Sequence, residues 1–157
     1  MKKNKIIWIL LRLSFAWIML WAFFDKVFGL GISTSPEKAW LAGNSPTTGF
    51  LKGVNGPFAE IYNNLAGNPI IDWLFMLGLL LIGLALLFGI AIKIASYSGG
   101  IFMFLLWTAS IWPKNNPFLD KHLIYALIFL SFSTIPIGDW FGLGKWWKST
   151  ALVKKYK

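Results

Sequence analysis

The sequence predicts an all-α membrane protein: a four-transmembrane-helix bundle with a long outer loop that carries short amphipathic helices. The 157 residues are 57% hydrophobic and only 13% charged, whereas a soluble domain carries about 25% charged residues. Four apolar segments reach the length of about 20 residues that a bilayer core requires. The lysines lie at the chain ends and between the apolar segments, where membrane proteins carry their topology signal. These observations favour a single membrane domain over residues 1–157 and exclude an ordinary soluble enzyme.

The four expected spans have distinct ends in the sequence. The second and third spans are separated by little more than Lys93, which indicates a tight helical hairpin. The stretch 1–30 also has the lysines and apolar run of a signal peptide, but its length, Arg12 and the lack of a small-residue cleavage site favour a retained helix. The expected spans are residues 6–30, 70–92, 94–112 and 121–141.

The outer loop, residues 31–69, contains two patterns typical of short helices. Ser35 and Pro36 form a helix start, and Gly43 is a plausible stop. Residues 57–65 place apolar side chains at helical spacing before Gly67. Such helices could cap the bundle or form a lid over a site, and amphipathic spacing does not distinguish the two.

The distribution of lysines predicts the orientation in the membrane. The side with the N-terminal lysines, Lys93 and the basic tail 142–157 carries more positive charge than the side with the outer loop. By the positive-inside rule, both termini are expected in the cytoplasm, with the chain a multi-pass protein of the cell membrane. The net charge of +9 therefore reflects topology, and no nucleic-acid partner is expected.

Arg12 is the one charged residue in the middle of an expected span. Of the six acidic residues, only Asp139 lies at the same end of a span. We therefore expect a structural ion pair between Arg12 and Asp139, or an Arg12 side chain that extends to the interface.

Ionisable residues also gather at the expected outer end of the helices. We expect Asp25, Lys26, Asp72 and His122 to line one pocket under the outer loop, with the rim formed by Asp120 and Trp73. In a functional reading, Lys26 holds an anion or polarises a carbonyl oxygen, His122 exchanges a proton, and the other four residues bind the substrate. In a structural reading, these are ordinary charges at helix ends, where the helix dipole favours Asp72 and Asp120.

The composition restricts the possible redox chemistry. The chain contains no cysteine and a single histidine. Disulfides, thiolate metal sites and iron–sulfur clusters within the chain are thus excluded, and no metal site is expected. Any redox role would use a borrowed cofactor or a bound organic carrier, with no covalently bound cofactor.

Three segments resemble the DoxX/DoxD family of membrane proteins. Residues 10–29 run from LLRL to AFFDKVFG and are similar to the arginine-bearing first helix of that family. Residues 137–147, IGDWFGLGKWW, resemble its C-terminal signature, although family members often have aspartate where Gly144 stands. Residues 40–51, WLAGNSPTTGFL, are similar to the DoxD branch, the membrane subunit of thiosulfate:quinone oxidoreductase. The resemblance implies a four-helix membrane protein linked to quinone redox chemistry or sulfur metabolism.

Two functions of different classes remain open at this stage. The chain could be a quinone-linked oxidoreductase subunit that oxidises a small sulfur anion such as thiosulfate, with quinone as its carrier. It could instead be a non-catalytic accessory subunit that packs against a larger respiratory or other membrane complex, because glycines on the second and third spans permit close helix approach. A small-solute carrier is disfavoured by the lack of an inverted repeat.

Overall fold

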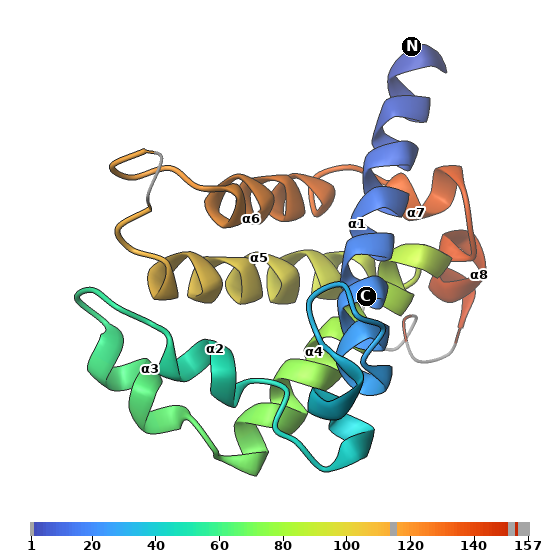
Figure 1. Cartoon of the computed structure of the whole chain (residues 1–157). Helices are drawn as coiled ribbons and strands as arrows, with labels where there is room; N and C mark the ends of the chain where they lie inside the picture. Colours follow the sequence, from blue (N-terminus) through green and yellow to red (C-terminus); the bar gives the residue numbers. More distant parts are fainter. Residues whose placement is uncertain (1, 114–115, 151–152, 154–157) are drawn as a thin grey trace.

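The chain folds entirely into helices connected by turns in the part that the computed structural model describes, residues 2–113, 116–150 and 153. Figure 1 shows α1 crossing the neighbouring pair α5 and α6 at a steep angle, with α4 beside α1. In chain order, the elements are α1 (Lys2–Phe28), η1 (Pro36–Lys38), η2 (Trp40–Ala42), α2 (Thr48–Lys52), α3 (Ala59–Leu65), α4 (Pro69–Phe88), α5 (Ile92–Ala109), α6 (Lys121–Phe132), α7 (Ile137–Trp140) and α8 (Gly144–Ser149).

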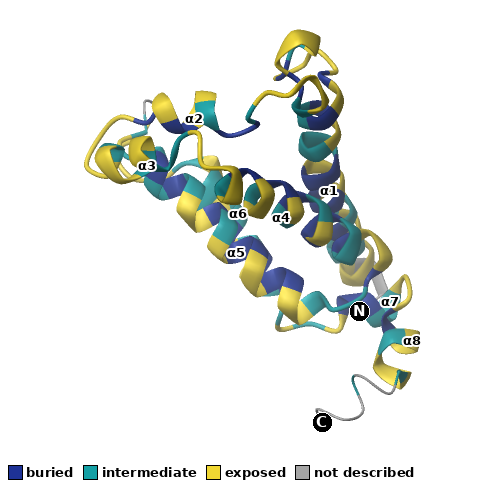
Figure 2. Ribbon diagram, turned by 90° about the horizontal axis from the view of Figure 1, so that it is seen from below, coloured by how far each residue is buried: buried dark blue, intermediate teal, exposed yellow. Residues whose placement is uncertain are grey.

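Three helices are long and apolar enough to cross a membrane: α1, α4 and α5. They include apolar stretches of 25, 20 and 18 residues, which at 1.5 Å per residue match a hydrocarbon core of about 30 Å. Many large apolar side chains on these helices point away from the protein, among them Trp17 of α1, Leu81 of α4 and Ile101 of α5, and Figure 2 marks the exposed residues in yellow. These exposed apolar faces indicate contact with membrane lipid.

The expected fourth span, residues 121–141, is not one continuous helix. α6 ends at Phe132, and the four-residue α7 begins only at Ile137. Pro136 explains the break, because proline lacks a backbone N–H and disfavours helical geometry in the residue before it. With 12 residues, α6 is about 18 Å long, so a four-span bundle is not confirmed.

The α4–α5 hairpin turns earlier than the sequence indicated. Gly89 adopts a left-handed conformation with φ of 74°, and its N–H donates to the carbonyl of Ala85. This glycine cap ends α4 at Phe88 and not at residue 92. Lys93 consequently lies in the first turn of α5 and not between the helices.

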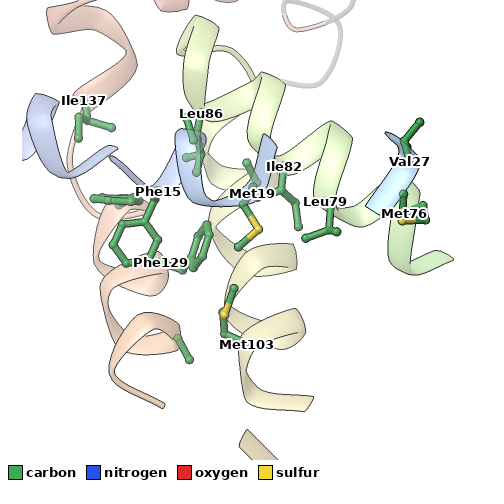
Figure 3. Packing of buried hydrophobic residues seen from close by; sticks show 14 residues of the cluster. Phe15, Met19, Val27, Met76, Leu79, Ile82, Leu86, Met103, Phe129 and Ile137 are labelled. Atoms are coloured by element: carbon green, nitrogen blue, oxygen red, sulfur yellow. The ribbon is translucent and has the colours of Figure 1, made fainter. Parts of the chain in front are cut away.

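The four longest helices share one apolar core (Figure 3). Phe15 of α1 contacts Phe129 of α6 edge-on, with ring centroids 5.1 Å apart. α5 and α6 approach closely because Gly99 has no side chain: a Cβ there would lie 2.4 Å from the Phe129 ring. The glycines of the third expected span therefore serve packing within this chain.

The outer loop contains more helical turns than expected. The predicted helix after Pro57 is present as α3, and Gly67 follows it with φ of 83°. The predicted helix after Ser35 consists instead of two 3₁₀ turns, η1 and η2, and Gly43 ends the second with φ of 85°. The loop also forms α2, which the sequence analysis did not anticipate.

The helices define two ends of the molecule. At the tail end, Lys5 of α1 lies over the ring of Trp140 in α7, and the α4–α5 turn contacts the same region. At the loop end, residues 31–68 join α1 to α4. The structure thus groups the segments that were expected to share one side, while Lys114 and the tail residues Lys154, Lys155 and Lys157 lie outside the described residues.

Candidate functional site

A cavity of about 280 Å³ lies between the four longest helices, toward the loop end, and we call it the four-helix cavity. Each of α1, α4, α5 and α6 contributes to its wall. The wall is apolar except on the side of α6, which supplies Lys121, His122 and Tyr125. The remaining lining residues are Ile18, Met19, Ala22, Phe75, Leu79, Phe102, Met103 and Leu106.

His122 lines the four-helix cavity and contacts Asp120, which lies outside the cavity lining. The Nδ1 atom of His122 lies 2.6 Å from Oδ2 of Asp120. The other carboxylate oxygen of Asp120, Oδ1, accepts hydrogen bonds from the backbone N–H groups of His122 and Leu123, so Asp120 is the N-cap of α6. A carboxylate accepts hydrogen bonds, so this contact favours the tautomer with the proton on Nδ1. Nε2 then remains available for a ligand, since no described residue forms a hydrogen bond with it.

Two aromatic rings line the cavity together with His122. Phe75 of α4 and Phe102 of α5 have ring centroids 5.2 Å apart, with an interplanar angle of 38°. Both rings line the cavity. Apolar walls with one or two convergent polar groups are typical of small-molecule sites, and here they suit a flat ring that carries an oxygen atom.

A second hollow, which we call the loop-end groove, lies beside this site. It has a volume of about 960 Å³ and runs between the α2–α3 connection, the end of α5 and the start of α6. Asp120 and Lys121 line the groove, and Lys121 also lines the four-helix cavity. The start of α6 therefore separates a wide groove from a smaller, mostly apolar cavity.

Lys26 lies near the cavity but does not line it. Its Nζ atom donates to the carbonyl of Pro46 at 3.1 Å. The same atom lies 5.7 Å from the ring centre of Phe75, whose ring also faces the cavity. Lys26 thus holds the outer loop and one aromatic wall of the site in place.

The two buried aspartates fasten the outer loop. The Asp25 carboxylate accepts hydrogen bonds from the backbone N–H groups of Ile32 and Ser33, and from the Ser33 hydroxyl at 2.7 Å. Asp72 accepts the hydroxyls of Ser45 at 2.8 Å and Thr47 at 2.5 Å. These bonds satisfy the carboxylates and fix where the loop crosses the bundle.

The six residues expected to share one pocket are divided among separate places. The structure brings His122 and Asp120 into contact, with His122 in the wall of the four-helix cavity and Asp120 in the wall of the loop-end groove. Trp73, with 57% of its surface exposed, packs edge-on against Trp40 of η2. Asp25, Lys26, Asp72 and Trp73 do not line the four-helix cavity.

The expected ion pair between Arg12 and Asp139 is wrong. Arg12 is fully buried, so it does not extend to the interface either. Its Nη1 atom donates to the carbonyls of Ile137 at 3.2 Å and Phe141 at 2.7 Å. Asp139 instead pairs with Lys148 of α8. The break after α6 explains the difference, because it turns backbone carbonyls of the α7 segment toward Arg12.

Sequence reasoning did not identify the apolar walls of the cavity. Phe75, Phe102 and Met103 are indistinguishable from lipid-facing residues in an apolar helix, because their direction depends on helix rotation. The Asp120–His122 contact had a local signal: an aspartate N-cap two residues before a histidine.

Comparison with family models, with curated proteins and with solved structures finds no match to the chain.

Proposed function

We propose that this membrane protein holds the ring of a quinone in the four-helix cavity and takes part in quinone-linked oxidation of a small sulfur anion such as thiosulfate. The observation that carries the proposal is the cavity itself: its walls are aromatic and aliphatic side chains from four helices, and they include His122, which contacts Asp120. The resemblance of residues 10–29, 40–51 and 137–147 to the DoxX/DoxD family supports this proposal.

The size of the cavity suits one ring. Ligand sites commonly span about 300–1,000 Å³, and 280 Å³ lies just below that range. An isoprenoid tail would extend between helices into lipid, where the exposed faces are apolar. Phe75 and Phe102 would then contact the ring.

His122 can form a hydrogen bond with either redox form of the ligand. When neutral, with its proton on Nδ1 facing Asp120, the imidazole offers Nε2 as an acceptor for a hydroquinone O–H. When protonated, it offers an N–H to a quinone carbonyl.

The electrons in this proposal come from outside the chain. With no cysteine and one histidine, the chain has few groups that could hold a redox centre of its own. The same observation favours the second candidate function, an accessory membrane subunit whose partner protein supplies the redox group. In both cases the partners are lipid and another membrane or redox protein.

Quinone binding tests the proposal directly. Decylubiquinone is titrated into the purified protein in detergent, and quenching of tryptophan fluorescence gives the Kd. Ala22 lines the cavity, so Ala22→Leu fills part of it and should weaken binding at least tenfold. Ala42→Leu, on the exposed surface of η2, is the matched control and should bind as the wild type does.

His122→Gln supplies the second arm of this test. Loss of a hydrogen bond worth about 1.5 kcal/mol should raise the Kd about tenfold, with the melting temperature nearly unchanged. Equal affinity in the wild type, Ala22→Leu and Ala42→Leu proteins would show that the quinone partitions into detergent and does not occupy the cavity.

A further inference from the structure

The start of α6 connects the two hollows at the loop end. Asp120 lines the loop-end groove and His122 lines the four-helix cavity. Nδ1 of His122 lies 2.6 Å from Oδ2 of Asp120. The side chains of Asp120 and His122 keep 14% and 20% of their surface exposed, respectively. The pair is therefore a hydrogen-bonded link of two side chains between a wide groove and a mostly apolar cavity.

We infer that Asp120 and His122 carry protons between the ligand in the four-helix cavity and water in the loop-end groove. The inference rests on the proposed quinone site and adds the route and the side of proton exchange. The ligand class is a lipophilic ring that gains or loses protons when its redox state changes, and the exchange occurs at the loop end of the molecule.

The proton step balances in both directions. When a hydroquinone gives two electrons to an oxidant, each O–H bond that breaks passes its proton to Nε2 of His122. The proton on Nδ1 moves to Oδ2 of Asp120 and from there to water in the groove, and the imidazole returns to its Nδ1-protonated tautomer before it accepts the second proton. Reduction of the quinone by a sulfur anion reverses the path: two anions each lose one electron, and two protons enter from the groove.

The other polar side chains in the cavity wall are less suited to this role. Lys121 also lines both hollows, but its side chain makes no hydrogen bond to a described residue. Tyr125 lines the cavity but not the groove. Among the described residues that line the two hollows, Asp120 and His122 are the pair that reaches both and shares a hydrogen bond.

Oxidation of bound hydroquinone provides the experiment. Decylubiquinol is bound to an excess of the detergent-solubilised protein and mixed with ferricyanide, a water-soluble one-electron oxidant. Phenol red reports proton release in a stopped-flow instrument. Two ferricyanide ions are reduced for each hydroquinone, and two protons are released.

Asp120→Asn is the decisive variant, because asparagine caps a helix as well as aspartate does but cannot carry the proton. We expect proton release from Asp120→Asn to be slower by at least tenfold, within the range of about 10²–10⁴ that general acid–base groups contribute. Asp139→Asn, whose carboxylate pairs with Lys148 at the tail end, is the matched control and should release protons at the wild-type rate.

Two further readouts separate proton transfer from a structural role. Acetate, a small weak acid that fits the groove, should restore the rate of Asp120→Asn but not that of His122→Gln. Proton release from Asp120→Asn at the wild-type rate, or a slow rate that acetate does not restore, would overturn the inference while leaving the quinone site in place. Failure of the wild type to bind decylubiquinol would instead refute the proposed function, and the inference with it.

Discussion

Arg12 should hold the α7–α8 segment against the bundle, and Arg12→Met tests this. The substitution removes two hydrogen bonds from a charged donor to the carbonyls of Ile137 and Phe141. At about 1.5–3 kcal/mol each, their loss costs about 3–6 kcal/mol. Part of this is offset, because an arginine within a membrane helix costs about 2.5–3.5 kcal/mol, and two of its buried nitrogen atoms have no partner among the described residues. The net loss is about 1.5 kcal/mol.

Limited proteolysis measures this loss at the place where it should occur. The exposed residues Lys145 and Lys148 of α8 are trypsin sites. When cleavage follows transient opening, its rate tracks the open population, and 1.5 kcal/mol corresponds to about a tenfold increase. Arg12→Lys keeps the positive charge but lacks the planar guanidinium group, so trypsin should cleave this variant at an intermediate rate.

Leu10→Met is the matched control, because Leu10 is on the same helix and exposed on the outer surface. It should leave cleavage of α8 unchanged. If Arg12→Met is cleaved at the wild-type rate, the two carbonyl contacts do not hold the segment. If Arg12→Met lowers the melting temperature of the protein but trypsin cleaves α8 at the wild-type rate, Arg12 stabilises the bundle and not the tail end.

Two other substitutions test the packing and the loop attachment. Gly99→Ala would place a Cβ 2.4 Å from the buried ring of Phe129. The overpacking should lower the free energy of unfolding by about 1–3 kcal/mol, measured as a lower melting temperature in detergent. Gly49→Ala, whose Cβ would meet open space, is the control and should change the free energy of unfolding by less than about 1 kcal/mol. An equal melting temperature for both variants would contradict the close α5–α6 approach. Asp72→Ala removes the acceptor of two hydroxyls and should weaken the loop attachment by about 3 kcal/mol, so that trypsin cuts after Lys52 about 100-fold faster. Unchanged cleavage would show that other contacts hold the loop.

The sequence alone determined the membrane character and the three long helices. These properties follow from composition along the chain, since a run of about 20 apolar residues is favourable in lipid whatever its neighbours are. Local stops were also predictable: Gly67, expected to end the second loop helix, follows α3 with φ of 83°. The aspartate N-cap of α6 has a similar local cause.

Only the tertiary structure decided what the buried charges meet. Arg12 lies 125 residues from Ile137, and their contact depends on how α1 packs against a segment that leaves the helix before Pro136. The four-helix cavity depends in the same way on the rotation of four helices, which places Phe75 and Phe102 beside His122. Apolar helices carry little sequence information about their rotation, because both their buried and their lipid-facing sides are hydrophobic.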